Sequence, residues 1–303
     1  PLTALQAALG VSLRGDACCL MWPSRREVDN HMRQPSMPQV VERPLSVPGI
    51  RLAHGRNVTF PTARTIVHAD YSIKLTVRGR GAPIHYRGTD HAPCVRGAIN
   101  IFEPFEPVHA RRSGAATSFI SLLVEPCVVG EAVEHLGATR RPDGIISGHV
   151  QAALALEMTA LCAELGSGVG RAELEARAVS ALERLLDSGA DSRIESGAPP
   201  AAVVRTRELI LDRLAENVPM DALERACGLS RFHLVRLFRQ YYRLPPHEFR
   251  IQARVALARR LLVGGVSPAA AASEVGFFDQ SHLHRHFRRI VGISPGAFQA
   301  AHR

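Results

Sequence analysis

The sequence of 303 residues has only one lysine, Lys74, so arginine supplies almost all of its positive charge. Aromatic residues are also scarce, at 5%, and aliphatic side chains must therefore fill most of any core. There is no apolar run of about 18 residues, which argues against a membrane-spanning helix. Residues 1–40 contain four arginines and no uninterrupted apolar stretch, so we expect no secretory signal and a cytoplasmic location.

Metal-binding spacings are absent as well. The six cysteines form no Cys-x-x-Cys pair, and no His-x-His pair occurs before residue 282. A structural zinc site typically needs the first kind of pair, and a metal-dependent β-barrel enzyme the second. We therefore expect no metal, no cofactor and no catalytic residues, with the cysteines present as free thiols.

The charge is concentrated in the last third of the chain. Residues 201–303 carry 16 arginines against 8 acidic residues, a net charge of +8. The preceding 200 residues carry 21 basic and 20 acidic residues and are almost neutral. A basic domain beside a neutral one indicates that only the C-terminal part meets a polyanion such as nucleic acid.

The composition and periodicity of successive segments predict an α+β protein of two domains. Residues 1–40 show no clear period and are expected to be a disordered extension. Residues 41–188 begin with short strand-like segments and end with helical ones, whereas residues 201–303 contain helical patterns only. Small, polar, Pro- and Gly-rich residues at 189–200 predict a linker between the two domains.

The strand-like segments are rich in β-branched and aromatic residues and recur about every ten residues, which fits a barrel or a sandwich. They cover residues 64–68, 71–77, 83–86 and 98–102. Two apolar stripes at helical spacing then predict helices over residues 149–165 and 170–187.

The strongest signal is an internal repeat. Residues 230–249 and 279–298 align at an offset of 49 residues with seven identities in one register, which indicates one supersecondary unit used twice. The identical pairs are His233/His282, Leu234/Leu283, Arg236/Arg285, Phe238/Phe287, Arg239/Arg288, Pro246/Pro295 and Phe249/Phe298.

Each copy reads as a helix-turn-helix. Short helices are expected at 220–227 and 268–275, each followed by a turn that contains glycine. Ser230 and Asp279 are suitable N-caps for the second helix of each unit. A longer helix over 246–262 joins the two units.

The second helix of each unit presents arginines on the face opposite its apolar stripe. Arg236 and Arg239 occupy this face in the first copy, and Arg285 and Arg288 occupy it in the second. The planar guanidinium group can bind the edge of guanine or a phosphate through two hydrogen bonds. We therefore expect both helices to contact double-stranded DNA.

Residues 203–301 resemble the AraC/XylS family of bacterial transcription regulators. The motifs that carry the resemblance are S-x-x-H-L-x-R-x-F-R at 230–239, A-R-R-L-L at 258–262, and V-G-F-F-D-Q-S-H-L-x-R-x-F-R-R-x-x-G-x-S-P-x-x-F at 275–298. The resemblance implies a regulator or activator of transcription that works with RNA polymerase. The DNA-contacting residues expected from the motifs and the helix faces are Phe232, Val235, Arg236, Arg239, Gln280, Ser281, His282, His284, Arg285 and Arg288.

Residues 67–109 are similar to the cupin-like sensor barrels that precede such DNA-binding domains. The similarity implies a small-molecule effector in the barrel and dimerisation through the helices at 149–165 and 170–187; the alternative is that these helices only cover the barrel. The candidate effector contacts are His68, Tyr71, His85, Tyr86 and His109.

Two enzymatic alternatives are open at this point. One is a cupin metalloenzyme fused to a DNA-binding module, for which several histidines offer ligands. The other is an alkyl-DNA repair protein, because Cys94 follows a proline as in the reactive site of such proteins. Cys94 lacks the following histidine that would help to generate a thiolate.

Overall fold

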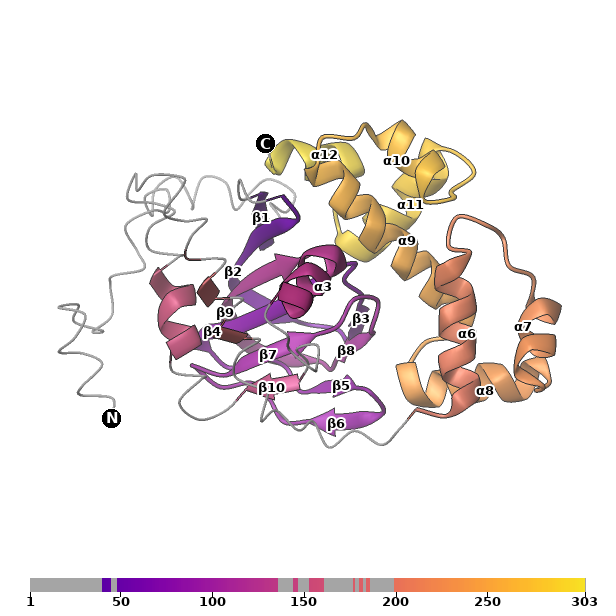
Figure 1. The fold of residues 1–303 in the computed structure, drawn as a ribbon, viewed down its shortest axis with the longest axis horizontal. Helices are drawn as coiled ribbons and strands as arrows, with labels where there is room; N and C mark the ends of the chain where they lie inside the picture. Colours follow the sequence, from indigo (N-terminus) through magenta and orange to yellow (C-terminus); the bar gives the residue numbers. More distant parts are fainter. Residues whose placement is uncertain are drawn as a thin grey trace.

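The computed structural model describes residues 40–44, 48–135, 144–146, 153–160, 177, 180–181, 184–185 and 199–302. A β-rich N-terminal part is followed by a C-terminal part made of helices, as the sequence predicts (Figure 1). The expected extension lies outside the described residues except for Val40, and the expected linker lies outside them except for its last two residues.

The described strands form two sheets. The six-stranded sheet has the order β1-β2-β9-β4-β7-β10 and the four-stranded sheet has the order β3-β8-β5-β6, with antiparallel pairing throughout. The strands are β1 Val40–Pro44, β2 Ile50–Phe60, β3 Arg64–Ile66, β4 Tyr71–Gly79, β5 Ile84–Tyr86, β6 Thr89–His91, β7 Ile99–Phe102, β8 Val108–Ala110, β9 Ser113–Val124 and β10 Gly144–Ile146.

Each face of the six-stranded sheet packs in its own apolar cluster. Ile73 and Ile101 lie in the cluster that covers the outer face together with residues of α3 (Pro126–His135). Phe102 points to the other face, where it packs against Ile84 and Val108 of the four-stranded sheet. The alternation of side chains along each strand therefore separates an outer core from an inner core between the sheets.

The expected helices at 149–165 and 170–187 lie largely outside the described residues. The prediction that they form a dimer interface therefore stays a prediction. Their described buried residues are Leu154, Met158, Ala181 and Leu185, which belong to the apolar cluster on the outer face of the sheet. This packing covers the sheet, which is one of the two roles expected for these helices.

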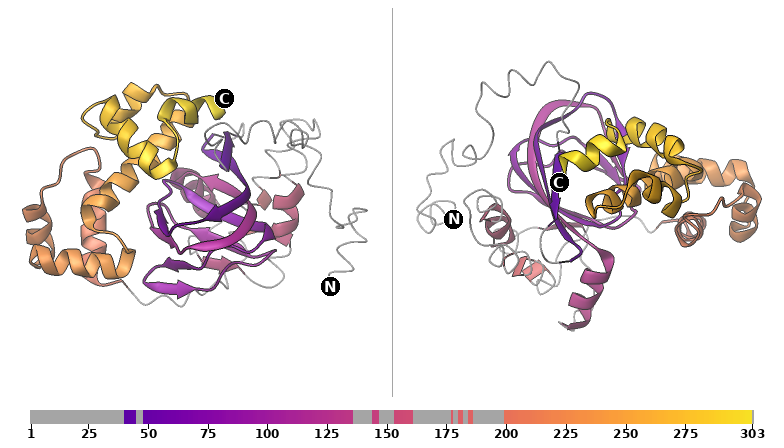
Figure 2. Two further views of the ribbon diagram at one scale, coloured as in Figure 1. Left: turned by 180° about the vertical axis from the view of Figure 1, so that it is seen from behind. Right: turned by 90° about the horizontal axis from the view of Figure 1, so that it is seen from above.

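The C-terminal part has seven helices among its described residues. They are α6 Ala201–Asp212, α7 Met220–Cys227, α8 Arg231–Tyr242, α9 Pro246–Val263, α10 Pro268–Glu274, α11 Gln280–Val291 and α12 Pro295–Ala301. The predicted boundaries of α7, α9 and α10 agree with these to within one residue. In Figure 1, α9 connects the unit that contains α7 and α8 to the unit that contains α10 and α11, and the C-terminal helices lie beside the β-rich part, as Figure 2 shows from two other sides.

Each helical unit has its own core. Leu234 and Phe238 lie at the centre of the first, and Leu283 and Phe287, at equivalent repeat positions, lie at the centre of the second. The turn before α11 requires Gly276, which has a φ of +84° and whose Cβ would lie 2.1 Å from the carbonyl oxygen of Ala215. The repeat in the sequence is thus a repeat of packing.

No helix within the described ranges is both long and apolar enough to cross a membrane.

Candidate nucleic-acid interface

Two helix-turn-helix units are present, as the repeat predicts. In the first, α7 ends at Gly228 in the left-handed conformation and α8 follows. In the second, α10 leads through a turn at Gly276 into α11. The second helix of each unit exposes the face that the sequence marks with arginine.

The second helices of the two units, α8 and α11, are called the recognition helices below, and their N-terminal ends are capped differently. Asp279 is the N-cap of α11, and its carboxylate accepts a hydrogen bond of 2.6 Å from the backbone N–H of His282. Ser230 is the N-cap of α8, but its side chain makes no capping hydrogen bond. Instead, Glu224 of α7 accepts a hydrogen bond from the backbone N–H of Arg231 at 2.5 Å. The predicted N-cap position of Ser230 is correct, but its side chain makes no capping bond, and Glu224 satisfies a different donor, the N–H of the first helical residue.

Both recognition helices border an open groove. The groove beside α8 has a volume of about 660 Å³, and the groove at the start of α11 has a volume of about 450 Å³. The first is lined by Met220, Arg231, Phe232, Val235, Arg236, Arg239, Gln240 and Arg243. The second is lined by Phe278, Asp279, Ser281, His282 and Arg285.

The arginines of the repeat are unneutralised. Arg236, Arg239, Arg285 and Arg288 are exposed, and within the described part of the chain none of them has an acidic partner within 4 Å. By contrast, Arg289 pairs with Glu248 at 2.8 Å, although it neighbours Arg288 in the sequence. Four free guanidinium groups on two equivalent helix faces provide the positive charge that a phosphate backbone attracts.

Most of the other predicted DNA contacts are exposed. Phe232 is 83% exposed, and Gln280, Ser281 and His284 are exposed on α11. The two half-buried members of the predicted set are Val235 and His282. The ring of His282 packs edge-on against Phe277, so part of its role is structural.

Four exposed residues of these grooves escaped the sequence analysis, and one of them is Arg231, which begins α8. Gln240 and Arg243 continue the face of α8 that begins at Phe232, and the spacing of 4, 7, 8 and 11 residues along that face could have revealed them. Phe278 is 92% exposed in the turn before α11, and an apolar residue in a turn gives no periodic signal.

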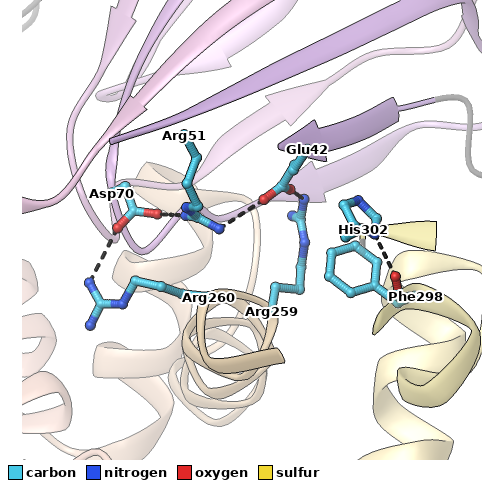
Figure 3. Close-up of polar contacts among 7 residues, drawn as sticks. All are labelled: Glu42, Arg51, Asp70, Arg259, Arg260, Phe298 and His302. Atoms are coloured by element: carbon cyan, nitrogen blue, oxygen red, sulfur yellow. Dashed lines mark hydrogen bonds and ion pairs between the residues drawn. The ribbon is translucent and has the colours of Figure 1, made fainter. Parts of the chain in front are cut away.

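The connecting helix α9 is anchored to the β-rich part by ion pairs (Figure 3). Arg259 contacts Glu42 of β1, and Arg260 contacts Asp70 at 3.2 Å. Arg51 of β2 lies between the two carboxylates and contacts both, at 2.9 Å for Glu42. Burial alone would raise the pKa of Glu42, but the neighbouring Arg259 and Arg51 hold it below its usual value.

Two further contacts join the domains at the first helical unit. His85 of β5 lies 3.0 Å from the carbonyl oxygen of Tyr241 through Nε2 and 2.8 Å from Asp90 through Nδ1. Glu106 faces Arg207 of α6 at 3.4 Å. Burial raises the pKa of Glu106 to about 7, an effect that Arg207 only partly offsets. The C-terminal end of α8 therefore rests on the N-terminal domain.

The predicted effector contacts do not converge on one place. Tyr71 is buried in the outer core of the large sheet, whereas the Tyr86 hydroxyl accepts a hydrogen bond of 3.2 Å from the N–H of Glu103 between the sheets. His85 serves the domain contact just described, and His109 lies 3.1 Å from the hydroxyl of Thr65. Burial lowers the pKa of His68 to about 3.

The two enzymatic alternatives find no support in the described residues. The described residues contain no group of three or more His, Cys, Asp or Glu side chains that could hold a metal ion. Burial raises the pKa of the Cys94 thiol, which donates a hydrogen bond of 3.1 Å to Asn100, so the site does not favour a thiolate.

Comparison with known proteins agrees with this geometry. Residues 223–301 match a family model described as a helix-turn-helix domain. The chain is 28% identical over 242 residues to the arabinose operon regulatory protein of Escherichia coli, covering 76% of this chain and 80% of that protein. It is also 28% identical over 194 residues to the uncharacterised HTH-type transcriptional regulator YbfI of Bacillus subtilis, covering 62% of this chain and 70% of that protein.

Among solved structures, an apo variant of ToxT from Vibrio cholerae superposes with a TM-score of 0.51 and 11% sequence identity. The match covers 86% of this chain and all of the other, which supports a shared fold across both domains.

Proposed function

We propose that this DNA-binding transcription regulator, which is similar to proteins of the AraC family, inserts α8 and α11 into neighbouring major grooves on one face of the duplex. Arg236 and Arg285 would read base edges, and Arg239 and Arg288 would hold phosphates. The observation that supports this assignment is a set of four exposed arginines at equivalent positions of the repeat, none of which has an acidic partner among the described residues.

The length of α9 fits this arrangement. Its 18 residues span about 27 Å at a rise of about 1.5 Å per residue. Successive major-groove segments on one face of DNA are about 34 Å apart, and side chains extend the reach of both units. One chain could therefore read two half-sites.

Selection from random DNA with the full chain tests the proposal. We expect a bipartite motif whose halves are centred about 10 base pairs apart. A variant with alanine at all four arginines should select no motif, whereas Arg289→Ala, which removes a paired arginine of α11, should select the same motif. A motif of one half-site only would contradict the assignment of two readers.

We propose that residues 41–188 form a cupin-like effector domain that regulates the C-terminal domain, with residues 189–200 as the linker. The two facing sheets and the ion pairs that join them to α9 support this proposal. An effector should change the affinity of the full chain for its selected operator and leave that of residues 201–303 unchanged.

Dimerisation through the helices at 149–165 and 170–187, and contact with RNA polymerase from the bound operator, belong to the same proposal. Sedimentation of the full chain tests the first, because a monomer at high micromolar concentration would rule out these helices as the dimer interface. In vitro transcription with purified polymerase tests the second, and an operator that neither raises nor lowers transcript yield would contradict it.

A further inference from the structure

Lys74, the only lysine, points into the space between the two sheets. It lies on β4 between Ile73 and Leu75, which pack in the outer core. Side chains alternate along a strand, so Lys74 faces the opposite side. On that side, Phe102 and Phe119 of the neighbouring strands pack toward the four-stranded sheet.

The ammonium group of Lys74 has no counter-charge among the described residues. Its neighbours include the ring of Phe119, whose centroid lies 4.4 Å from Nζ, and the thiol of Cys94, whose pKa is raised by burial, so that the thiol supplies no negative charge. The buried acids Glu42, Asp70 and Glu106 are each paired with arginine at the domain boundary. Burial lowers the pKa of Lys74, as expected for a cation that has lost water without gaining an anion.

Polar groups surround this lysine in one row of the sheet. Ser121 of β9 and Asn100 of β7 stand directly opposite Lys74 on its two sides. The hydroxyl of Ser72 lies 3.1 Å from that of Ser121. The hydroxyl of Thr76, a residue only 1% exposed, has no hydrogen-bond partner in the described part of the chain. A buried polar atom without a partner is costly, so a site of this kind favours a ligand that supplies one.

We propose that the space between the sheets binds a small monocarboxylate, whose carboxylate pairs with Lys74 and accepts hydrogen bonds from neighbouring donors. This inference rests on the proposed function, because it names the chemical class of the effector. Lys74 is half-buried and not fully enclosed, so a ligand can reach it.

The surroundings select the class of ligand. One unpaired cation balances one negative charge, whereas a phosphate dianion would leave a buried excess. Phe102, Phe119 and Leu123 lie on the same face and offer apolar surface to the rest of the molecule. Gly55 leaves room for the ring that supports Lys74, because a Cβ there would lie 2.4 Å from Phe119.

The test compares acids with their uncharged analogues. The full chain is equilibrated at neutral pH with straight-chain monocarboxylates from acetate to octanoate, benzoate and the matching primary amides. Bound compounds are then quantified by equilibrium dialysis and mass spectrometry. We expect at least one acid to bind roughly tenfold or more tightly than its amide, the effect of one hydrogen bond to a charged group.

Lys74→Met should abolish this preference, and Arg78→Met is the matched control, because Arg78 is exposed on the same strand. Equal binding of acids and amides, no binding of any acid, or a preference retained in Lys74→Met would overturn the proposal. If Lys74→Met does not fold, the wild-type comparison and Lys74→Gln decide. Operator binding is measured on the same samples. If an uncharged compound alters operator binding and no acid is preferred, the proposed control by an effector stands and the anion site is refuted.

Discussion

Arg259 of α9 pairs with Glu42 of β1 across 217 positions of the sequence, and this contact ties the helix between the two helix-turn-helix units to the first described strand. Glu42 is 2% exposed and is shared with Arg51, which is itself buried. The docking of the two domains therefore depends on a carboxylate that two guanidinium groups hold ionised.

Replacing Glu42 with glutamine should destabilise the full chain by about 3 kcal/mol, because removal of one partner leaves buried charge uncompensated. Urea unfolding measures the change. Glu208→Gln is the control, since Glu208 is exposed on α6 and should change the free energy of unfolding by less than about 0.5 kcal/mol. Similar values for the two variants would show that the ion pair contributes nothing to the native state.

The contribution of Glu106, which faces Arg207, to the free energy of unfolding should change with pH near neutrality. The pKa of Glu106 in the folded protein is about 7, above the ordinary value of 4.5, with burial as the main cause. The folded state thus holds the proton more tightly than the unfolded state, and this contribution to stability is present below about pH 4.5 and is lost as pH rises through 7.

Glu106→Gln, which cannot ionise, should remove that loss. Melting temperatures of wild type and variant between pH 5 and pH 8 provide the measurement, and the wild type should lose more stability over this range. Parallel curves would mean that Glu106 titrates at an ordinary value. Burial of His68, with a pKa of about 3, acts in the opposite direction below pH 6.5, so the comparison is between variants and not between absolute melting points.

The two N-caps should differ in their contribution to stability. Asp279→Ala removes the acceptor for the N–H of His282 and should cost about 1 kcal/mol. Ser230→Ala should be nearly neutral, because the Ser230 hydroxyl makes no capping bond and Glu224 already accepts from the N–H of Arg231. Chemical unfolding of the two single variants makes the comparison. Equal losses would show that Ser230 caps α8 in solution.

These caps illustrate what the sequence could and could not reveal. Seven identities in one register predict both recognition helices and their outer arginines, because periodicity is a local property. Which side chain satisfies a donor at a helix end also depends on residues of the neighbouring helix, such as Glu224, and a propensity rule does not contain that information.

Long-range contacts were beyond prediction. Arg259 and Arg260 look in sequence like solvent-facing arginines of α9, yet their partners lie 217 and 190 residues earlier. The same limit explains the effector residues. Tyr71 and Lys74 are three positions apart on one strand, and only the packing of the two sheets determines that Tyr71 faces the outer core while Lys74 faces the interior.

Binding of the full chain to operator DNA should weaken steeply with salt. Contact with about 6–10 phosphates would reduce the affinity by roughly 10³–10⁵ between 50 and 200 mM salt. Arg239→Ala and Arg288→Ala should each reduce the slope of log affinity against log salt by about 1. Arg289→Ala should not, because that guanidinium group is paired with Glu248. Fluorescence anisotropy across a salt series measures all four proteins, and a flat response of the wild type would contradict the phosphate contacts.

Arg236 and Arg285 occupy equivalent places on α8 and α11, and both face solvent without an acidic partner among the described residues. Alanine at either position should weaken specific binding by about 1–3 kcal/mol, as for the loss of a base-reading contact. Each change should relax the sequence preference in a different half of the operator. Arg239→Ala and Arg288→Ala are the controls, which should lower affinity evenly across sequences.

Inserting five base pairs between the halves turns one of them to the opposite face of the duplex, about half a helical turn away. Because α9 is a single helix anchored through Arg259 and Arg260, the two units cannot follow that rotation independently. Specific affinity should therefore fall toward the non-specific level. An insertion of ten base pairs returns both halves to one face of the duplex but separates them by more than α9 can span, so it should lower specific affinity as well. If the five-base-pair insertion leaves specific binding intact, only one of the two helices reads DNA.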